Sequence, residues 1–368
     1  MSQKRKVDKI FAFIVFLLIS LGFFLFMSAS MGLLAKGKSD FLNIFIKQIG
    51  LGLIGGLTAM FILSKINYRN YKKYAFYIFL ISIFISCLVF VPGIGLKHGG
   101  ASRWLNIFGF SFQPAELLKI SFVLYFATFL SVFRNKLNNW RYSVIPSFIL
   151  LGIIAGISFF QPDYGTLIII VLTALGMLLV AEINFKHLFI IVGSTFLAII
   201  PLALYKPYIW QRLLTFLNPS ADLAGAGYQI NHALISIGSG GFWGKGFGKS
   251  IQKFGYLPEP TGDSIFAVTA EEWGFIGCVL LLTLFLMFAF RGLKIASRST
   301  DVFGRLLAVG IVILIVSQSF INVASMLGIF PLTGMPLIFV SQGGTALLFA
   351  LAEVGILLNI STYKKRLV

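Results

Sequence analysis

Acidic residues are scarce in this sequence of 368 residues: 12 Asp and Glu stand against 30 Lys and Arg, and charged residues make up only 11%. Cysteine is almost absent as well. Cys87 and Cys278 each lie inside an apolar run, so the sequence indicates neither a disulfide framework nor a metal site with cysteine spacing. No internal repeat stands out, which gives little support to an inverted-repeat transporter.

Apolar residues fill most of the chain, with 58% hydrophobic residues and a strongly positive mean hydropathy. Apolar runs of about 20 residues recur, and each is long enough to cross a hydrocarbon core about 30 Å thick. Backbone polar groups in that medium must be satisfied internally, which favours helices, and the alternation typical of an outer-membrane barrel is not seen. We therefore predict an all-α polytopic membrane protein, with one integral membrane domain over residues 1–368.

The apolar runs predict ten transmembrane helices. The first follows Lys4, Arg5 and Lys6 and is too long for the hydrophobic region of a signal peptide, so we interpret it as a span. The predicted spans are 10–34, 41–64, 74–92, 114–133, 143–160, 164–182, 187–205, 264–290, 304–327 and 338–360.

Basic residues in the connecting loops predict the orientation. One alternate set of loops carries 19 of the 30 Lys and Arg residues and the other set carries 9, while two fall within spans. The positive-inside rule then places the N and C termini in the cytoplasm. It makes 206–263 a large extracytoplasmic loop between helices 7 and 8, with 213–217 and 230–237 apolar enough for short amphipathic helices on the membrane surface. The basic residues at helix ends suit anionic lipid rather than nucleic acid.

One polar, glycine-rich stretch, Gly227–Glu272, interrupts the apolar pattern and holds a third of all acidic residues: Glu259, Asp263, Glu271 and Glu272. Within it, LPEPTGD at 257–263 has two prolines and a glycine, which restrict and turn the backbone just before the eighth span. Asp263 is either the N-cap of that span or a carboxylate at the mouth of a cavity that takes a proton from a substrate hydroxyl. A cap would lower the pKa of Asp263 and keep it ionised, as a base requires.

The glycines at 238–248 do not form a nucleotide-binding loop, because Trp243 stands where GxxxxGK[ST] requires glycine. Two interpretations stay open for this run. It is a flexible turn, or its backbone N–H groups, with Lys245 and Lys249, face a pyrophosphate.

Ionisable side chains inside predicted spans are costly and mark candidate functional sites. Glu116 and Lys119 lie three residues apart on one helix face; they form an internal ion pair or contact a substrate. Glu353 is a further interior acid. At two predicted loops, Arg103 is an interfacial anchor or a phosphate ligand, and Asp163 is a helix N-cap or a functional carboxylate.

Six motifs, in order along nearly the whole chain, resemble the SEDS family (shape, elongation, division and sporulation), the FtsW/RodA group. They are FIKQIG at 45–50, HGGASRWLNIFGFSFQPAELLK at 98–119, QPDYGT at 161–166, GYQINHALISIGSGGFWGKGFGKS at 227–250, YLPEPTGDSIFAVTAEEWGFIG at 256–277 and PLTGMPLIFVSQGGT at 331–345.

The resemblance implies a peptidoglycan glycosyltransferase in the bacterial cytoplasmic (inner) membrane. Such an enzyme polymerises lipid II at the outer face, with undecaprenyl pyrophosphate as leaving group. Asp263 aligns with the family's essential loop aspartate, and Glu116, Lys119 and Asp163 align with polar residues of its central cavity. The spacing KSIQKFGYLPEP is more similar to the FtsW division branch than to the elongation branch.

The resemblance also implies partners and a chemistry. A class B penicillin-binding protein (a transpeptidase) and other divisome proteins are the expected partners. We expect Asp263 to act as base and Arg103, Lys119 and Arg212 to neutralise the leaving pyrophosphate, with Lys245 and Glu259 as further substrate-binding residues. A divalent cation (Mg or Mn) could share this task, although no ligand cluster in the sequence identifies one.

Two departures from the family pattern concern contacts to substrate. The family has His-Thr-Asp-Phe where this chain has Thr261-Gly262-Asp263-Ser264, and SYGGSS where this chain has SQGGTA at 341–346. Two other functions stay open: a lipid II flippase with Asp263 as a gate, and a noncatalytic scaffold for a division transpeptidase.

Overall fold

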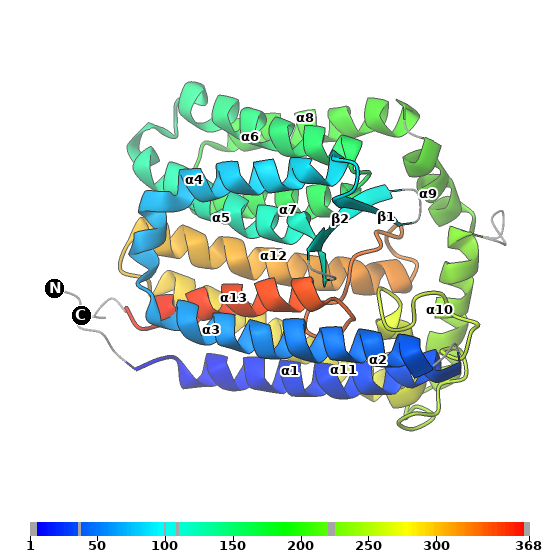
Figure 1. The fold of residues 1–368 in the computed structure, drawn as a ribbon. Coiled ribbons are helices and arrows are strands. Elements are labelled where there is room, and N and C mark those ends of the chain that lie inside the picture. Colours follow the sequence, from blue (N-terminus) through cyan, green and yellow to red (C-terminus); the bar gives the residue numbers. More distant parts are fainter. Residues whose placement is uncertain are drawn as a thin grey trace.

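The computed structural model describes residues 6–35, 38–98, 101–107, 110–205, 207–219 and 225–363, and most of these are helical (Figure 1). The helices are α1 (Lys9–Ser30), η1 (Met31–Ala35), α2 (Lys38–Lys47), η2 (Gln48–Gly55, a π-helix), α3 (Gly56–Lys65), α4 (Tyr68–Cys87), η3 (Leu88–Phe90), α5 (Pro114–Val132), η4 (Arg134–Lys136), α6 (Trp140–Phe160), α7 (Tyr164–Val180), α8 (Phe185–Tyr205), α9 (Pro207–Leu217), α10 (Ala226–Gly240), α11 (Ile265–Ser297), α12 (Val302–Met326) and α13 (Gly344–Ser361).

Eight helices of the described residues are long and apolar enough to cross a membrane. Two shorter apolar helices, Tyr164–Val180 and Phe185–Thr195, fall on the predicted spans 164–182 and 187–205. The prediction of a multi-pass helical membrane protein is therefore confirmed. The short helices predicted within 206–263 are also present, as α9 and α10.

The bundle has two distinct ends (Figure 1). The start of α1 and the end of α13 meet at one end, where the backbone N–H of Asp8 donates to Oγ of Ser361 at 3.1 Å. We call this the terminal end. α10 and the loop after it lie at the opposite end, which we call the site end. α12 runs between the two ends and packs against α5, α7 and α11.

A three-stranded antiparallel sheet stands beside the helices, so the expectation of an all-α fold was wrong in this respect. The strands β1 (Gly95–His98), β2 (Ala101–Ile107) and β3 (Phe110–Phe112) pair in the order β1-β2-β3, with Leu105 opposite both Gly95 and Phe112. Strands of three to seven residues give a weak periodic signal beside apolar runs of about 20 residues, which explains why the pattern was not recognised.

The start of the last helix was also predicted wrongly. α13 begins at Gly344 rather than at 338, because residues 331–343 form an irregular loop. Pro331 and Pro336 lack the N–H that a helix interior needs, and Gly334 adopts a φ of 68° outside the helical region. We call residues 331–343 the α12–α13 loop.

α11 is broken near its start. Gly274 has φ 63° and ψ −163°, which separates residues 265–273 from the rest of the helix. A Cβ on Gly274 would lie 2.3 Å from the backbone nitrogen of Gly244, so only glycine fits where the two chain segments meet. The loop after α10 bonds to the break: N–H of Phe275 donates to O of Gly241 at 2.9 Å, and N–H of Gly246 donates to O of Glu272 at 2.9 Å. We call residues 265–273 the half-helix.

Candidate active site

Asp263 lies in a tight turn directly before the half-helix. The carbonyl oxygen of Glu259 accepts from N–H of Gly262 at 3.0 Å and from N–H of Ser264 at 3.2 Å, which closes the turn. Glu259 itself has a φ of 46° and an exposed side chain. A Cβ on Gly262 would lie 3.2 Å from its carboxylate oxygen Oε2, so Glu259 folds back towards the turn.

The Asp263 carboxylate accepts a hydrogen bond from α10. Nε2 of Gln229 donates to Oδ1 of Asp263 at 3.1 Å and to Oγ of Ser264 at 3.0 Å. Burial raises the pKa of Asp263 to about 6; the Gln229 hydrogen bond and the charge of Arg212 oppose this, while the Glu259 carboxylate adds to it. A carboxyl with this pKa is largely ionised near pH 7 and is a better proton acceptor than an ordinary aspartate.

The alternative interpretation of Asp263 as a helix cap was wrong. The N-cap of α11 is Ser264, one residue further on. The pKa of Asp263 is raised rather than lowered, because burial dominates over the hydrogen bond that it accepts. The carboxylate instead accepts from Gln229 through Oδ1, and its Oδ2 lies beside Gly334, at the space described next.

Arg212 of α9 faces the same space as Asp263. Its Nη1 donates to the carbonyl oxygen of Leu332, which fixes the guanidinium over the α12–α13 loop. A Cβ on Gly334 would lie 3.8 Å from Nη2 of Arg212 and 4.0 Å from Oδ2 of Asp263. The missing side chain of Gly334 thus leaves a small space flanked by a cation and a base. An anionic leaving group and a hydroxyl nucleophile need these two groups side by side.

The side chain of Asn322, which was not predicted as a site residue, bonds to the backbone of the Asp263 turn. Nδ2 of Asn322, on α12, donates to the carbonyl oxygen of Asp263 and to that of Met335, both at 2.8 Å. Asn322 is 1% exposed. Inside spans, only ionisable residues were predicted as candidates, although a buried amide in an apolar helix also needs hydrogen-bond partners.

The α12–α13 loop is joined to the Asp263 turn at two further points. Oγ of Ser341 donates to the carbonyl oxygen of Gly262 at 2.6 Å, and N–H of Gln342 donates to the carbonyl oxygen of Thr261 at 2.6 Å. Oγ1 of Thr261 also lies 2.6 Å from Oε1 of Gln342. Thr261 and Gln342 stand where the family pattern has His and Tyr, so the two departures from that pattern contact each other.

Glu116 and Lys119 form a buried ion pair on α5, as one of the two interpretations predicted. Nζ of Lys119 lies 2.9 Å from Oε2 of Glu116 and donates to Oε1 of Gln318 at 2.6 Å. Glu116 is 5% exposed and Lys119 is 2% exposed. Nε2 of Gln318 donates to the carbonyl oxygen of Pro336 at 3.1 Å, so the pair reaches the α12–α13 loop through Gln318. Direct contact with a substrate would require this pair to open.

Arg103 and Asp163 meet at the turn before α7. Asp163 is the N-cap of α7: it accepts from N–H of Thr166 at 3.3 Å and from Oγ1 of Thr166 at 2.9 Å. Nε of Arg103 donates to the carbonyl oxygen of Gln161 at 3.2 Å, and its Nη2 donates to that of Pro162. The capping interpretation of Asp163 is confirmed, and Arg103 holds this turn through backbone carbonyls.

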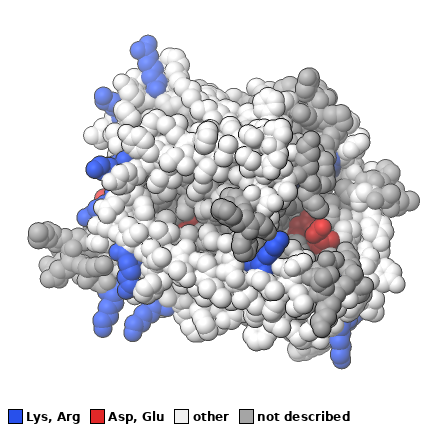
Figure 2. Space-filling model, in the orientation of Figure 1, with Lys and Arg blue, Asp and Glu red and all other residues white. Residues whose placement is uncertain are grey.

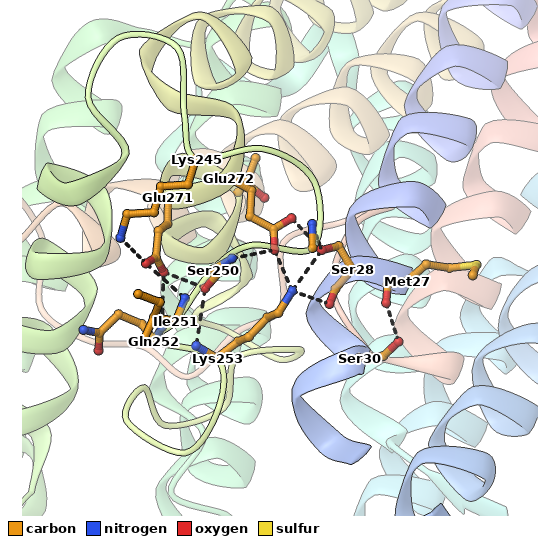
Figure 3. A network of polar contacts seen from close by, with 12 residues as sticks. Met27, Ser28, Ser30, Lys245, Ser250, Ile251, Gln252, Lys253, Glu271 and Glu272 are labelled. Carbon is orange, nitrogen blue, oxygen red and sulfur yellow. Dashed lines mark hydrogen bonds and ion pairs between the residues drawn. The ribbon is translucent and has the colours of Figure 1, made fainter. Parts of the chain in front are cut away.

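Lys245 lies in a second polar cluster, further along the half-helix (Figure 3). Its Nζ lies 2.7 Å from Oε1 of Glu271 and donates to Oγ of Ser239 at 2.9 Å. Glu271 also accepts from Oγ of Ser250 at 2.5 Å and from N–H of Ile251 at 3.2 Å. Glu271 follows Asp263 by eight residues, about 12 Å along a helix, so Lys245 fixes the loop rather than facing Asp263.

Three buried residues complete this cluster. Nζ of Lys253 lies 2.7 Å from Oε1 of Glu272, and Oγ of Ser28 on α1 donates to Oε2 of Glu272 at 2.5 Å. We call Ser28, Lys253 and Glu272 the clasp (Figure 3). Lys253 was not among the predicted site residues, because its partners lie 19 and 225 residues away in the chain.

The fold and this arrangement define a polytopic helical protein with a carboxylate and a guanidinium at one end of the bundle. The family model described as "Cell cycle protein", named for FtsW, RodA and SpoVE, matches residues 8–366. The chain belongs to this family.

Similar proteins and structures cover nearly the whole chain. It is 36% identical over 368 residues to "Stage V sporulation protein E" of Bacillus subtilis (strain 168), covering 99% of both chains. It is 36% identical over 365 residues to "Probable peptidoglycan glycosyltransferase FtsW" of Geobacter sp. (strain M18), covering 98% of both.

Among solved structures, one described as "Structural coordination of polymerization and crosslinking by a peptidoglycan synthase complex" matches with a TM-score of 0.77 and 26% identity, covering 96% of this chain and 97% of that one. The rod shape determining protein RodA of Thermus thermophilus matches with a TM-score of 0.71 and 26% identity, covering 98% of both chains. These likenesses extend to the whole bundle rather than to one part of it.

Proposed function

We propose that this chain is a peptidoglycan glycosyltransferase that polymerises lipid II into glycan strands during cell division. The observation that carries the proposal is the pairing of Asp263 and Arg212 across the space beside Gly334. Relatives that match nearly the whole chain are named probable peptidoglycan glycosyltransferases, which supports the same reaction here.

In the proposed reaction, the 4-hydroxyl of a GlcNAc on one lipid II attacks the anomeric carbon of the lipid-linked MurNAc on another. Asp263 takes the proton of the hydroxyl as the new C–O bond forms. The bond from the anomeric carbon to the pyrophosphate oxygen breaks, and the centre is inverted. Undecaprenyl pyrophosphate leaves with its negative charge facing Arg212, which is held in place before the reaction.

The proposed topology has ten transmembrane helices, cytoplasmic termini and an extracytoplasmic active site. Two contacts between α1 and α11 support one part of it, the placing of the terminal end and the site end on opposite sides of the membrane. Arg291 pairs with Asp8 at the terminal end, and Glu272 bonds to Ser28 at the site end. These contacts are separated by 20 residues along α1 and 19 along α11, about 30 Å of helix and so the thickness of the hydrocarbon core.

The charge distribution supports the same orientation. On the face drawn in Figure 2, most of the Lys and Arg side chains in view lie at the terminal end. An excess of basic residues marks the cytoplasmic side of bacterial membrane proteins. The site end would then face outside, in the cytoplasmic membrane of a bacterium.

A class B penicillin-binding protein and other divisome proteins are the proposed partners. The support is the likeness to a structure described as a peptidoglycan synthase complex. A divalent cation is proposed only as a group shared with substrate phosphates. In the described part of the chain, no three His, Cys, Asp or Glu side chains gather around one point. A magnesium ion held mainly by substrate phosphates needs only one or two protein carboxylates. Asp263 and Glu259 are the carboxylates that would supply them.

The test is polymerisation of fluorescent lipid II by the purified chain together with its transpeptidase, resolved as glycan ladders on a gel. The proposal expects polymer that a muramidase digests. A headgroup-translocation assay in vesicles runs in parallel. Translocation without polymer would establish the flippase, and neither activity, with the transpeptidase still bound, would establish the scaffold.

A further inference from the structure

The clasp provides three hydrogen-bond acceptors for the three N–H groups of the buried Lys253 ammonium. Nζ of Lys253 contacts Glu272 at 2.7 Å and donates to the carbonyl oxygen of Ser28 at 3.0 Å and to its Oγ at 3.2 Å. Lys253 is 1% exposed, Glu272 is 2% exposed and Ser28 is fully buried. The loop after α10, the half-helix and α1 are therefore tied at one point (Figure 3).

A buried ion pair of this kind contributes little net stability. Removing two charges from water costs several kcal/mol per ion, and apolar side chains of similar volume stabilise a protein interior as well or better. Glu272 lies within the span predicted over 264–290, and an ionisable group inside a membrane span is a candidate functional position. The place of the clasp in the fold indicates which function it serves.

The clasp holds the far end of the half-helix that Asp263 precedes. Glu272 follows Asp263 by nine residues, about 14 Å along a helix. The break at Gly274 separates this short helix from the rest of α11, so the long part of α11 does not fix its tilt. Glu271 bonds to Ser236, Lys245 and residues 250–252 of the neighbouring loop, whereas Glu272 reaches α1. The clasp therefore sets the half-helix against α1.

We propose that Lys253 is a positioning residue for the reaction: with Glu272 and Ser28 it fixes the half-helix against α1 and thereby sets the place of the Asp263 carboxylate. This inference rests on the proposed function. If Lys253 has this role, a displacement of α1 or of the loop after α10 moves the half-helix, and the half-helix moves the Asp263 carboxylate. A residue that shifts the reacting group by about 1 Å can change the rate about 100-fold.

The chain offers a matched control at the other end of the same two helices. Arg291 bonds to Asp8 through Nε at 3.0 Å and through Nη2 at 2.9 Å. This pair also joins α1 to α11, but it lies beyond the break at Gly274. Breaking it weakens the same helix pair without touching the half-helix, so it separates positioning from stability.

The experiment compares wild type with Lys253→Met, Ser28→Ala and Arg291→Met. Ser28→Ala keeps the ion pair and removes only the hydroxyl link to α1, which covers the case in which Lys253→Met fails to fold. Two quantities are measured: kcat and KM for lipid II polymerisation, and the pH midpoint at which a hydrophobic carbodiimide modifies Asp263, read by mass spectrometry. Arg212 and Glu259, which face Asp263, are unchanged in every variant.

We expect Lys253→Met to lower kcat about 10-fold or more and Ser28→Ala to lower it about threefold, both with KM nearly unchanged. Both should lower the carbodiimide midpoint, because a loosened half-helix admits water to Asp263. Arg291→Met should keep kcat and the midpoint of wild type even if it unfolds at a lower temperature. Folded Lys253→Met and Ser28→Ala with wild-type kcat and midpoint, or the same loss in Arg291→Met, would overturn the proposal. Absence of polymer from wild type would defeat the proposed function instead, while the midpoints would still decide the role of the clasp.

Discussion

Nδ2 of Asn322 lies 2.8 Å from the backbone carbonyl oxygen of Asp263 and 2.8 Å from that of Met335. One amide group on α12 thus joins the turn that carries the base to the α12–α13 loop, which carries Gly334. Arg212 is fixed to the same loop through Leu332. The base and the cation therefore share one support, and their separation depends on a residue that touches neither reacting group.

Asn322→Ala tests this support. The substitution leaves the buried carbonyl oxygen of Met335 and the partly buried one of Asp263 without their donor, and the buried group alone costs about 1–3 kcal/mol in the free energy of unfolding. We expect kcat for polymerisation to fall about 10-fold, with a smaller change in KM, because the turn loses its place. Asn359→Ala is the control: Asn359 likewise joins two segments, accepting from N–H of Tyr68 at 2.9 Å and donating to O of Ser64 at 2.8 Å. An equal loss of kcat in both variants would show that stability alone is measured.

Asp263→Asn should stabilise the folded protein at neutral pH. A carboxyl whose pKa is raised from 3.8 to about 6 on folding binds its proton more tightly in the folded state. Stability is therefore lost as pH rises from about 4 through 6, and the loss at pH 7.5 amounts to at most about 3 kcal/mol. Asparagine avoids this loss and can still accept from Gln229. Thermal unfolding in detergent should show the gain at pH 7.5, with roughly half of it at pH 5.

Asp301→Asn should change the stability of the folded protein in the opposite direction. Burial would raise the pKa of Asp301, but hydrogen bonds from Tyr68, Gly304 and Arg69 outweigh it and lower the pKa. Its charge stabilises the folded state above the ordinary aspartate range, so removing it should lower the unfolding temperature at pH 7.5. A lower unfolding temperature for Asp263→Asn as well would contradict a raised pKa at Asp263.

The rate of polymerisation should follow the ionised fraction of Asp263. Because the ionised form accepts the proton, kcat/KM should rise with pH about 10-fold per unit below pH 6 and level off above it. About a tenth of the plateau rate should remain at pH 5. Lipid II binding, measured at each pH, separates a loss of binding from a loss of chemistry. A profile that stays flat from pH 5 to 8 would exclude Asp263 as the group that titrates.

Gly334→Ala should block the space between Arg212 and Asp263. The added methyl would meet protein atoms only at 3.8 Å and beyond, so the variant should fold with about 1 kcal/mol of strain from the φ of 68°. It would occupy the space proposed for the reacting groups, and we expect kcat/KM to fall about 10-fold or more. Gly328→Ala is the matched control, with φ 67° and its nearest contacts on Leu234 and Ile230 at 3.9–4.0 Å. Similar activities of the two variants would place the substrate elsewhere.

The sequence was sufficient to predict the helical membrane architecture and to single out Asp263 as a candidate, because long apolar runs and the turn LPEPTGD are local signals. The supports of Asp263 are not local. Gln229 and Asn322 lie 34 and 59 residues from it, and Ser28 lies 244 residues from Glu272. Neutral amides and a serine in apolar helices carry no periodic signature, so a single sequence does not show which of them meet.

Charge identified residues that need a partner, but not which partner they have. Glu116 and Lys119 were selected as ionisable groups inside a span, and Arg103 and Lys245 as loop cations that could face a phosphate. Each of them bonds to a partner within the protein. The pattern of these residues was informative, but it could not distinguish a structural partner from a substrate. Arg212, by contrast, gave little signal in the sequence, and the structure brings it to Asp263 through the fold of α9 over the α12–α13 loop.

The most direct test of the account is polymerisation of lipid II by Asp263→Asn beside wild type, each purified with the transpeptidase. Asp301→Asn is the control, because it makes the same change of charge at the N-cap of α12, where the side chain pairs with Arg69. We predict polymer from wild type and Asp301→Asn and a loss of at least about 100-fold in Asp263→Asn. Equal polymer from all three proteins would remove Asp263 from the mechanism.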